Sequence, residues 1–139
     1  MEHPAVPFTA TRYGASYMEE VTTTGVVRVD GVSLVLEFQD EALNYTSLAR
    51  ERGAVRSVSI PLTQVDAVTV SRKWPWGGRI TIQTRTLEVL GALPMAKGSE
   101  CTLRIRRADH DRARELAIGV SLHLANEAMR RLEEGGATQ

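Results

Sequence analysis

The sequence predicts a mainly β fold of about seven short strands followed by one C-terminal α-helix. Short segments in which apolar and polar residues alternate fill most of residues 21–105, and this alternation indicates strands with one buried face. From about residue 108 to about residue 134 the apolar residues recur at helical spacing instead. With 139 residues, 42% of them hydrophobic, the chain is sized for one domain with a buried core.

The N-terminal part is predicted to lie outside that domain. Pro4, Pro7 and Gly14 interrupt a stretch without sustained periodicity, so residues 1–17 are expected to form a flexible tail. The domain is then expected to span residues 18–134, and residues 135–139 to form a short C-terminal tail.

A β-hairpin is predicted near the start of the domain. The β-rich residues 26–29 and 32–38 flank Asp30-Gly31. This dipeptide is the strongest short-range hairpin signal, because both central positions of the turn favour residues that tolerate a positive φ.

Further strands are predicted wherever the alternation resumes. They cover residues 55–62, 67–72, 79–85, 87–90 and 99–107. The polar residues 39–54 fit either a short strand that leads into a loop or a helical turn. Pro61 lacks a backbone donor and should mark the end of a strand, an edge or a bulge. Cys101, Leu103 and Ile105 should face inward, and the lone Cys101 should behave as a small buried hydrophobe.

The C-terminal helix is predicted to carry two apolar faces. Asp109 and Asp111 suit its start, and Gly135-Gly136 should end it. One arc contains Ala113, Leu116, Ala117, Val120, Leu124 and Ala128, and a second contains Ile118, Leu122, Ala125, Met129 and Leu132. One face should pack on the strands. The other needs a further partner, which is either another part of the chain or a second copy of it.

Three segments resemble the bacterial families of pleckstrin-homology (PH) domains. They are residues 59–68, which contain Ile60-Pro61-Leu62 and Val65, the strand at 78–82, and the entry into the helix at 106–113, which contains Asp109 and Ala113. Over residues 18–134 the resemblance implies a partly open barrel of about seven antiparallel strands capped by the helix. The first hairpin lacks the Lys-x-Lys/Arg signature of eukaryotic PH domains, so phosphoinositide binding by that route is not expected.

The most distinctive predicted surface is a loop with two tryptophans framed by cations. It comprises Arg72, Lys73, Trp74, Trp76 and Arg79. Such a loop suits a membrane interface, a nucleobase or a protein partner, unless the indoles fold back over the end of the barrel.

The net charge of zero conceals a basic middle segment, because residues 71–114 carry ten basic and four acidic side chains. Arg104, Arg106 and Arg107, with Arg79 and Arg85, form either a strip for an anionic ligand or a solvated face whose charges pair with Glu88 and Glu100. A nucleic-acid partner is not expected, because it would call for a higher net charge and more aromatic residues.

No catalytic or metal-binding motif is recognisable. His110 lies between Asp109 and Asp111, but successive residues at a helix start point in different directions, and no His, Cys and carboxylate spacing fits zinc. Serine elbows, Walker loops and dinucleotide fingerprints are missing from the sequence. We therefore expect neither an enzyme nor a cofactor.

The sequence favours a non-catalytic PH-like binding or assembly module that acts through protein–protein interaction or homo-oligomerisation. The alternative is peripheral membrane or anionic-ligand binding through Trp74 and Trp76. A cytoplasmic location is expected because no apolar run could span a bilayer, with membrane association if the tryptophan loop binds an anionic surface.

Overall fold

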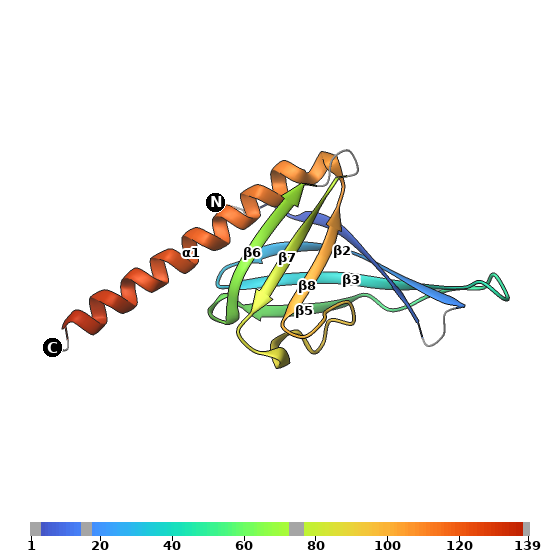
Figure 1. Ribbon diagram of the computed structural model, residues 1–139, viewed down its shortest axis with the longest axis horizontal. Coiled ribbons are helices and arrows are strands. Elements are labelled where there is room, and N and C mark those ends of the chain that lie inside the picture. The colour runs from blue at the N-terminus through green and yellow to red at the C-terminus, as the bar shows by residue number, and fades with distance from the viewer. Residues whose placement is uncertain (1–3, 15–17, 73–76, 138–139) are drawn as a thin grey trace.

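The computed structural model describes residues 4–14, 18–72 and 77–137, and it confirms the mainly β architecture with a C-terminal helix (Figure 1). Within these ranges eight antiparallel strands form one sheet in the order β4-β3-β2-β1-β8-β7-β6, and β5 pairs with β3. The strands are β1 Val6–Tyr13, β2 Glu19–Asp30, β3 Ser33–Asn44, β4 Arg50–Arg52, β5 Arg56–Pro61, β6 Val65–Arg72, β7 Gly78–Thr84 and β8 Glu100–Ile105. The sheet curls into a partly open barrel that the helix α1, His110–Ala137, caps.

The expectation of a flexible N-terminal tail is wrong, because residues 6–13 form β1 in the middle of the sheet. This strand pairs with β2 along its whole length and meets β8 at Thr9. Val6 and Phe8 are buried in the core. Two apolar positions were too few to outweigh Pro4 before them and Pro7 between them. Pro7 is tolerated within the strand opposite Val26. The folded domain therefore begins well before residue 18.

The predicted hairpin between β2 and β3 is confirmed, with its turn one residue later than expected. Asp30 still pairs with Ser33, so Gly31 and Val32 make the turn, and only Gly31 of the two has a positive φ, at 60°. A glycine with positive φ at the first central position is the pattern of a type II′ turn.

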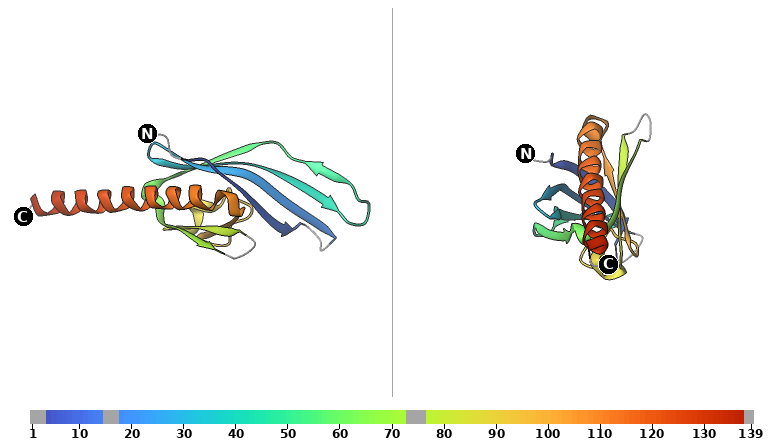
Figure 2. Two further views of the ribbon diagram at one scale, coloured as in Figure 1. Left: turned by 90° about the horizontal axis from the view of Figure 1, so that it is seen from above. Right: turned by 90° about the vertical axis from the view of Figure 1, so that its left-hand side faces the viewer.

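A second glycine lets these two long strands coil around the core. A Cβ atom at Gly25 would lie 2.2 Å from the carbonyl oxygen of Glu37 on β3, so no larger residue fits there. From Gly25 toward the start of β2, and from Phe38 toward the end of β3, the two strands extend past the barrel as an arm (Figures 1 and 2). The tip of this arm carries β4.

The chain turns from one side of the barrel to the other at Pro61. This proline ends β5 as expected, and the 3₁₀-helix η1, Leu62–Gln64, leads directly into β6. At this edge α1 packs mainly against β6, with further contacts to η1, β1 and β2. The helix thus covers the last strand of the sheet.

Residues 87–90 were expected to form a strand, and this prediction is wrong. They form the 3₁₀-helix η2, Leu87–Leu90, in which Leu90 points into the core while Leu87 is exposed. Leu90 and the nearby Leu93 are buried in the core between β7 and β8. A short apolar run fits a strand and a single helical turn equally well, so the pattern could not separate them.

The core lies between the inner face of the sheet, α1 and the 87–96 segment. Its largest fully buried side chains are Phe8, Phe38, Leu34, Leu36, Ile60, Leu62, Ile80, Ile82, Leu90, Leu103, Ile105 and Leu116. Cys101 is also fully buried, and it faces inward with Leu103 and Ile105 as predicted.

Candidate functional site

The C-terminal half of α1 extends away from the barrel (Figures 1 and 2). The helix has 28 residues, and its fully buried side chains, Ala113, Leu116 and Val120, all lie in the first half. Ala117 and Leu124 pack at the margin of the core, whereas residues 128–135 are all exposed. The first predicted arc therefore packs on the barrel as expected, except at Ala128, where the helix has already left it.

The second predicted arc of α1 is exposed to solvent over its whole length. The exposed fractions are 54% for Ile118, 60% for Leu122, 61% for Met129 and 75% for Leu132, and Ala125 is exposed as well. These five residues, which we call the α1 seam, are spaced four, three, four and three residues apart. This is the heptad spacing of a helix that packs against another helix. At 100° per residue the seam points about 145° away from the side that rests on the barrel.

Small residues border the α1 seam. Ser121 and Ala128 lie beside Ala125, so another helix can approach closely there.

Gly135 and Gly136 do not end the helix as expected. Gly135 keeps a helical backbone instead of the left-handed conformation of a C-cap. A free helical segment of about 14 residues is marginally stable in water. Its apolar face therefore calls for a partner.

The predicted tryptophan loop can be placed only at its two ends. Lys73, Trp74 and Trp76 lie outside the described residues. Arg72 is the exposed last residue of β6, where it pairs with Gly78. Arg79 is exposed on the outer face of β7, opposite Arg104 of β8.

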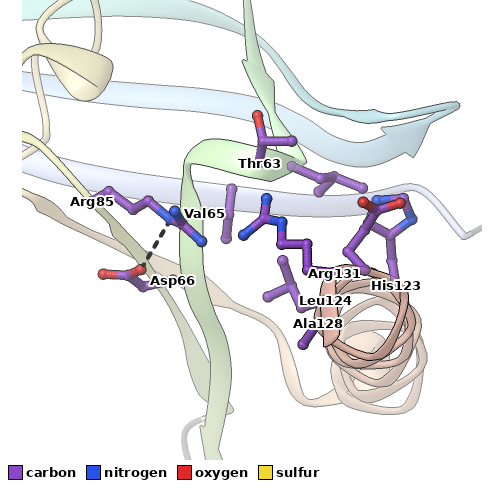
Figure 3. Close-up of a pocket in the computed structure, with 10 residues that line it drawn as sticks. Thr63, Val65, Asp66, Arg85, His123, Leu124, Ala128 and Arg131 are labelled. Atoms are coloured by element: carbon purple, nitrogen blue, oxygen red, sulfur yellow. Dashed lines mark ion pairs between the residues drawn. The ribbon is translucent and has the colours of Figure 1, made fainter. Parts of the chain in front are cut away.

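A small groove of about 120 Å³ lies where α1 leaves the barrel (Figure 3). Leu124, Ala128 and Arg131 line it from the helix, and Arg85 reaches Asp66 with 3.6 Å between guanidinium nitrogen and carboxylate oxygen. Because Arg85 is already paired with Asp66 and the volume is small, we assign this groove no ligand.

A larger groove, about 1000 Å³ in volume, lies where β1 and β8 diverge; we call it the β1–β8 groove. Its walls are formed by β1 from Thr9 to Tyr13, by Glu100, Thr102 and Arg104 of β8, and by residues 94–97. Arg79 and Glu20 complete the lining. No pattern in the sequence indicates this groove, because it depends on how two strands far apart in the chain separate.

The expected pairing of the basic strip with Glu88 and Glu100 does not occur. Arg85 pairs with Asp66 and Arg106 with Asp109 instead. Among the described residues, Arg79, Arg104 and Arg107 form no ion pair.

A polar cluster on the inner side of the sheet was also missed from the sequence. Asp40 accepts hydrogen bonds from the buried hydroxyl of Thr23 (2.5 Å), from Arg56 (2.7 Å) and from Arg12 (3.3 Å). Burial acts to raise the pKa of Asp40, but these hydrogen bonds and the two guanidinium charges outweigh it and hold that pKa below its usual value. The only sequence signal was the threonine run of β2, where one of three hydroxyls faces inward.

Other features of the described chain suggest no chemistry. No group of three or more His, Cys, Asp or Glu side chains in those ranges is arranged to hold a metal ion. Asp109, at the start of α1, is buried and pairs with Arg106 (3.0 Å) and Arg112 (3.8 Å). Burial raises the pKa of the Cys101 thiol to about 12.

The long helix is not a membrane span. In the described part of the chain no helix combines the length and the apolar character needed to cross a bilayer. Comparisons with protein-family models, with curated proteins and with solved structures found no match.

Proposed function

We propose that this chain is a non-catalytic, PH-like assembly module that pairs with a second copy of itself through the α1 seam. The observation that carries the proposal is the regular row of exposed apolar side chains on a helix that extends beyond its own domain. The strand pattern and the segments at residues 59–68 and 78–82 support the PH-like assignment by resemblance.

Burial of the exposed seam side chains sets the strength of the proposed dimer. Full burial of a leucine, isoleucine or methionine side chain is worth about 1.5–3 kcal/mol, so the fractions now exposed amount to about 4–7 kcal/mol per protomer. Two protomers together gain about 8–15 kcal/mol, against an association cost of about 4–15 kcal/mol. A dissociation constant in the micromolar range corresponds to a net gain of about 8 kcal/mol, which these ranges reach where the gain is near its upper end and the cost near its lower end.

An antiparallel pairing centred on Ala125 fits the seam best. In that arrangement Ile118 faces Leu132 of the second copy, Leu122 faces Met129, and the small Ala125 meets its own counterpart at the crossing point. Opposed helix dipoles attract each other, and the two barrels lie on opposite sides of the helix pair because the seam points away from each barrel. The seam is therefore close to symmetrical about its own midpoint.

A parallel pairing is less favourable because of Glu115. This exposed residue lies three positions before Ile118 and continues the row of seam positions. Parallel helices would bring Glu115 against Glu115 of the second copy, and like charges in direct opposition are destabilising. In the antiparallel pairing it faces the glycine-rich end of the partner helix instead.

Size-exclusion chromatography with light scattering tests the assembly. We expect the full chain to shift from monomer to dimer as its concentration rises through the micromolar range, and Leu122→Glu to remain monomeric because it buries a charge in the seam. Arg130→Glu is the matched control, since it places a carboxylate on the same stretch about 120° away from the seam. A wild-type chain that stays monomeric well above the micromolar range would refute the proposal.

Disulfide cross-linking tests the orientation. The double variant Ile118→Cys/Leu132→Cys should give an oxidised covalent dimer, whereas each single variant should not, because each cysteine faces the other position. The native Cys101 is buried and should not interfere. Cross-linking of the single variants instead would indicate a parallel pair.

A further inference from the structure

The edge strand β5 points a row of backbone groups away from the rest of the sheet. In the ladder between β3 and β5 the backbone N–H of Leu62 donates to the carbonyl oxygen of Val32 (2.8 Å), and the pairing continues without a register shift to Arg56. Backbone groups alternate in direction along each strand of an antiparallel pair. Those of Ser57 and Ser59 therefore point away from β3, and in the described chain they have no backbone partner on that side.

Within the part of the chain that the structure describes, β5 lacks the protection that the other sheet edges have. Proteins blunt an edge with short strands, charged side chains, bulges or a covering element. β4 has three residues, all of them charged, and β6 at the opposite end of the sheet is covered by α1. β5 has six residues and one charged side chain, Arg56, which is held by Asp40 and lies over the ring of Phe38. Its edge is therefore open to another strand.

The free edge of β5 is complementary to itself when a second copy runs antiparallel and the two strands cross at Val58. In this register Ser57 lies opposite Ser59 of the second copy, and Ser59 lies opposite its Ser57. Each outward N–H then donates to an outward carbonyl oxygen, as in any antiparallel ladder. Pro61, which has no N–H, comes at the end of the pairing, where its carbonyl oxygen accepts from Val55.

The side chains also match in this register. Val55 directly precedes β5 and is 70% exposed, and it meets the exposed Pro61 of the second copy. The half-buried Val58 meets its own counterpart. Arg56 lies opposite Ile60, so like charges are not opposed along the strand pair. The pairing thus joins apolar groups at both ends and in the middle without a charge conflict.

We propose that two copies of this chain pair through the β5 edge and form one continuous sheet across both barrels. The interface buries less apolar surface than the α1 seam, so it forms at a higher concentration, in the range of hundreds of micromolar. The β5 pairing does not depend on the seam. One consequence rests on the proposed function: where the seam also pairs, seam dimers join through β5 into larger assemblies.

Sedimentation velocity of the full-length Leu122→Glu variant, in which the seam is blocked, tests the β5 edge alone. We expect monomers at micromolar and dimers at several hundred micromolar concentration, and a further Ser59→Pro substitution should weaken this pairing at least about tenfold. Proline removes an N–H that points away from β3, so the ladder keeps its bonds. Arg52→Pro in the same background is the matched control and should still dimerise, because its N–H also points away from β3 but lies outside β5.

Amide hydrogen exchange gives a second readout that does not depend on a proline variant. In Leu122→Glu the amides of Ser57 and Ser59 should exchange rapidly in dilute solution and become protected at high concentration. The amides of Val58 and Ile60, which point toward β3, should be protected in both. A variant that stays monomeric at several hundred micromolar with Ser57 and Ser59 unprotected overturns the proposal, as does a dimer that Ser59→Pro leaves unchanged.

The wild-type chain separates the two interfaces. It should pass from the seam dimer to larger assemblies at several hundred micromolar concentration. A wild type that behaves as Leu122→Glu does would refute the seam and leave the β5 edge standing. A wild type that stops at the dimer, while Leu122→Glu stays monomeric, refutes the β5 edge and leaves the seam standing.

Discussion

The two faces of α1 should respond in opposite ways to the same truncation. Leu116 is fully buried, and it is the largest of the three α1 side chains that are fully enclosed by the barrel. Leu116→Ala removes its transfer energy and leaves a cavity that the smaller Ala113 and Val120 cannot fill. We expect it to lower the free energy of unfolding by about 3 kcal/mol, within the range of 2–5 kcal/mol measured for buried leucines.

Leu132→Ala makes the same chemical change at a site that is 75% exposed. In the monomer it should change the free energy of unfolding by less than about 0.5 kcal/mol. In the proposed dimer it removes apolar contact from the seam, so the dissociation constant should rise about tenfold for each 1.4 kcal/mol lost.

Urea unfolding at submicromolar protein concentration measures the first effect, and light scattering at higher concentration measures the second. The slope of free energy against urea should be the same for both variants, because neither changes the surface exposed on unfolding by much. If Leu132→Ala destabilises the dilute monomer as strongly as Leu116→Ala, or if Leu116→Ala costs less than about 1 kcal/mol, the helix does not pack on the barrel as described.

Three further outcomes are expected. Asp40→Asn should lower the free energy of unfolding at neutral pH by about 1–3 kcal/mol. In the wild type this stabilisation is complete above the ordinary carboxyl pKa of about 3.9, and it is lost as the pH falls through the lower pKa of Asp40 in the folded protein. An acid titration followed by circular dichroism measures this loss. Gly25→Ala should lower the melting temperature, because its Cβ would lie 2.2 Å from the Glu37 carbonyl oxygen, whereas a stability equal to that of wild type would contradict the tight coiling of β2. Cys101 should resist a thiol reagent in the native protein and react in urea, given its burial and its raised pKa of about 12; rapid native labelling would mean that the barrel opens at β8.

The sequence predicted best where one short segment decides its own structure. The alternation of Ile80 and Ile82 and of Leu103 and Ile105 placed two strands and their inner faces correctly, because the period of two is independent of the neighbouring strand. The helical spacing separated the two faces of α1 for the same reason. The strand at Val6 and Phe8 was missed because its two apolar positions were outweighed by the prolines around them.

The grooves and clusters depend on registers that no local pattern contains. That Arg79 lies opposite Arg104 follows from the pairing of β7 with β8, and that β8 meets β1 only at Thr9 follows from how far the sheet curls. The Asp40 cluster likewise joins three strands and an arginine on β5. In each case the sequence identifies the residues, but not which residues lie next to them on the neighbouring strands.

The position of β1 also has a kinetic consequence. β1 pairs with β2 on one side and with β8 on the other, so the sheet stays in two parts until Thr9 pairs with Arg104. These two residues are separated by nearly the whole length of the domain. Closing so long a loop costs chain entropy before the contact between β1 and β8 contributes any stability. We expect this domain to fold slowly for its size, and its rate to be limited by the step that joins its beginning to its end.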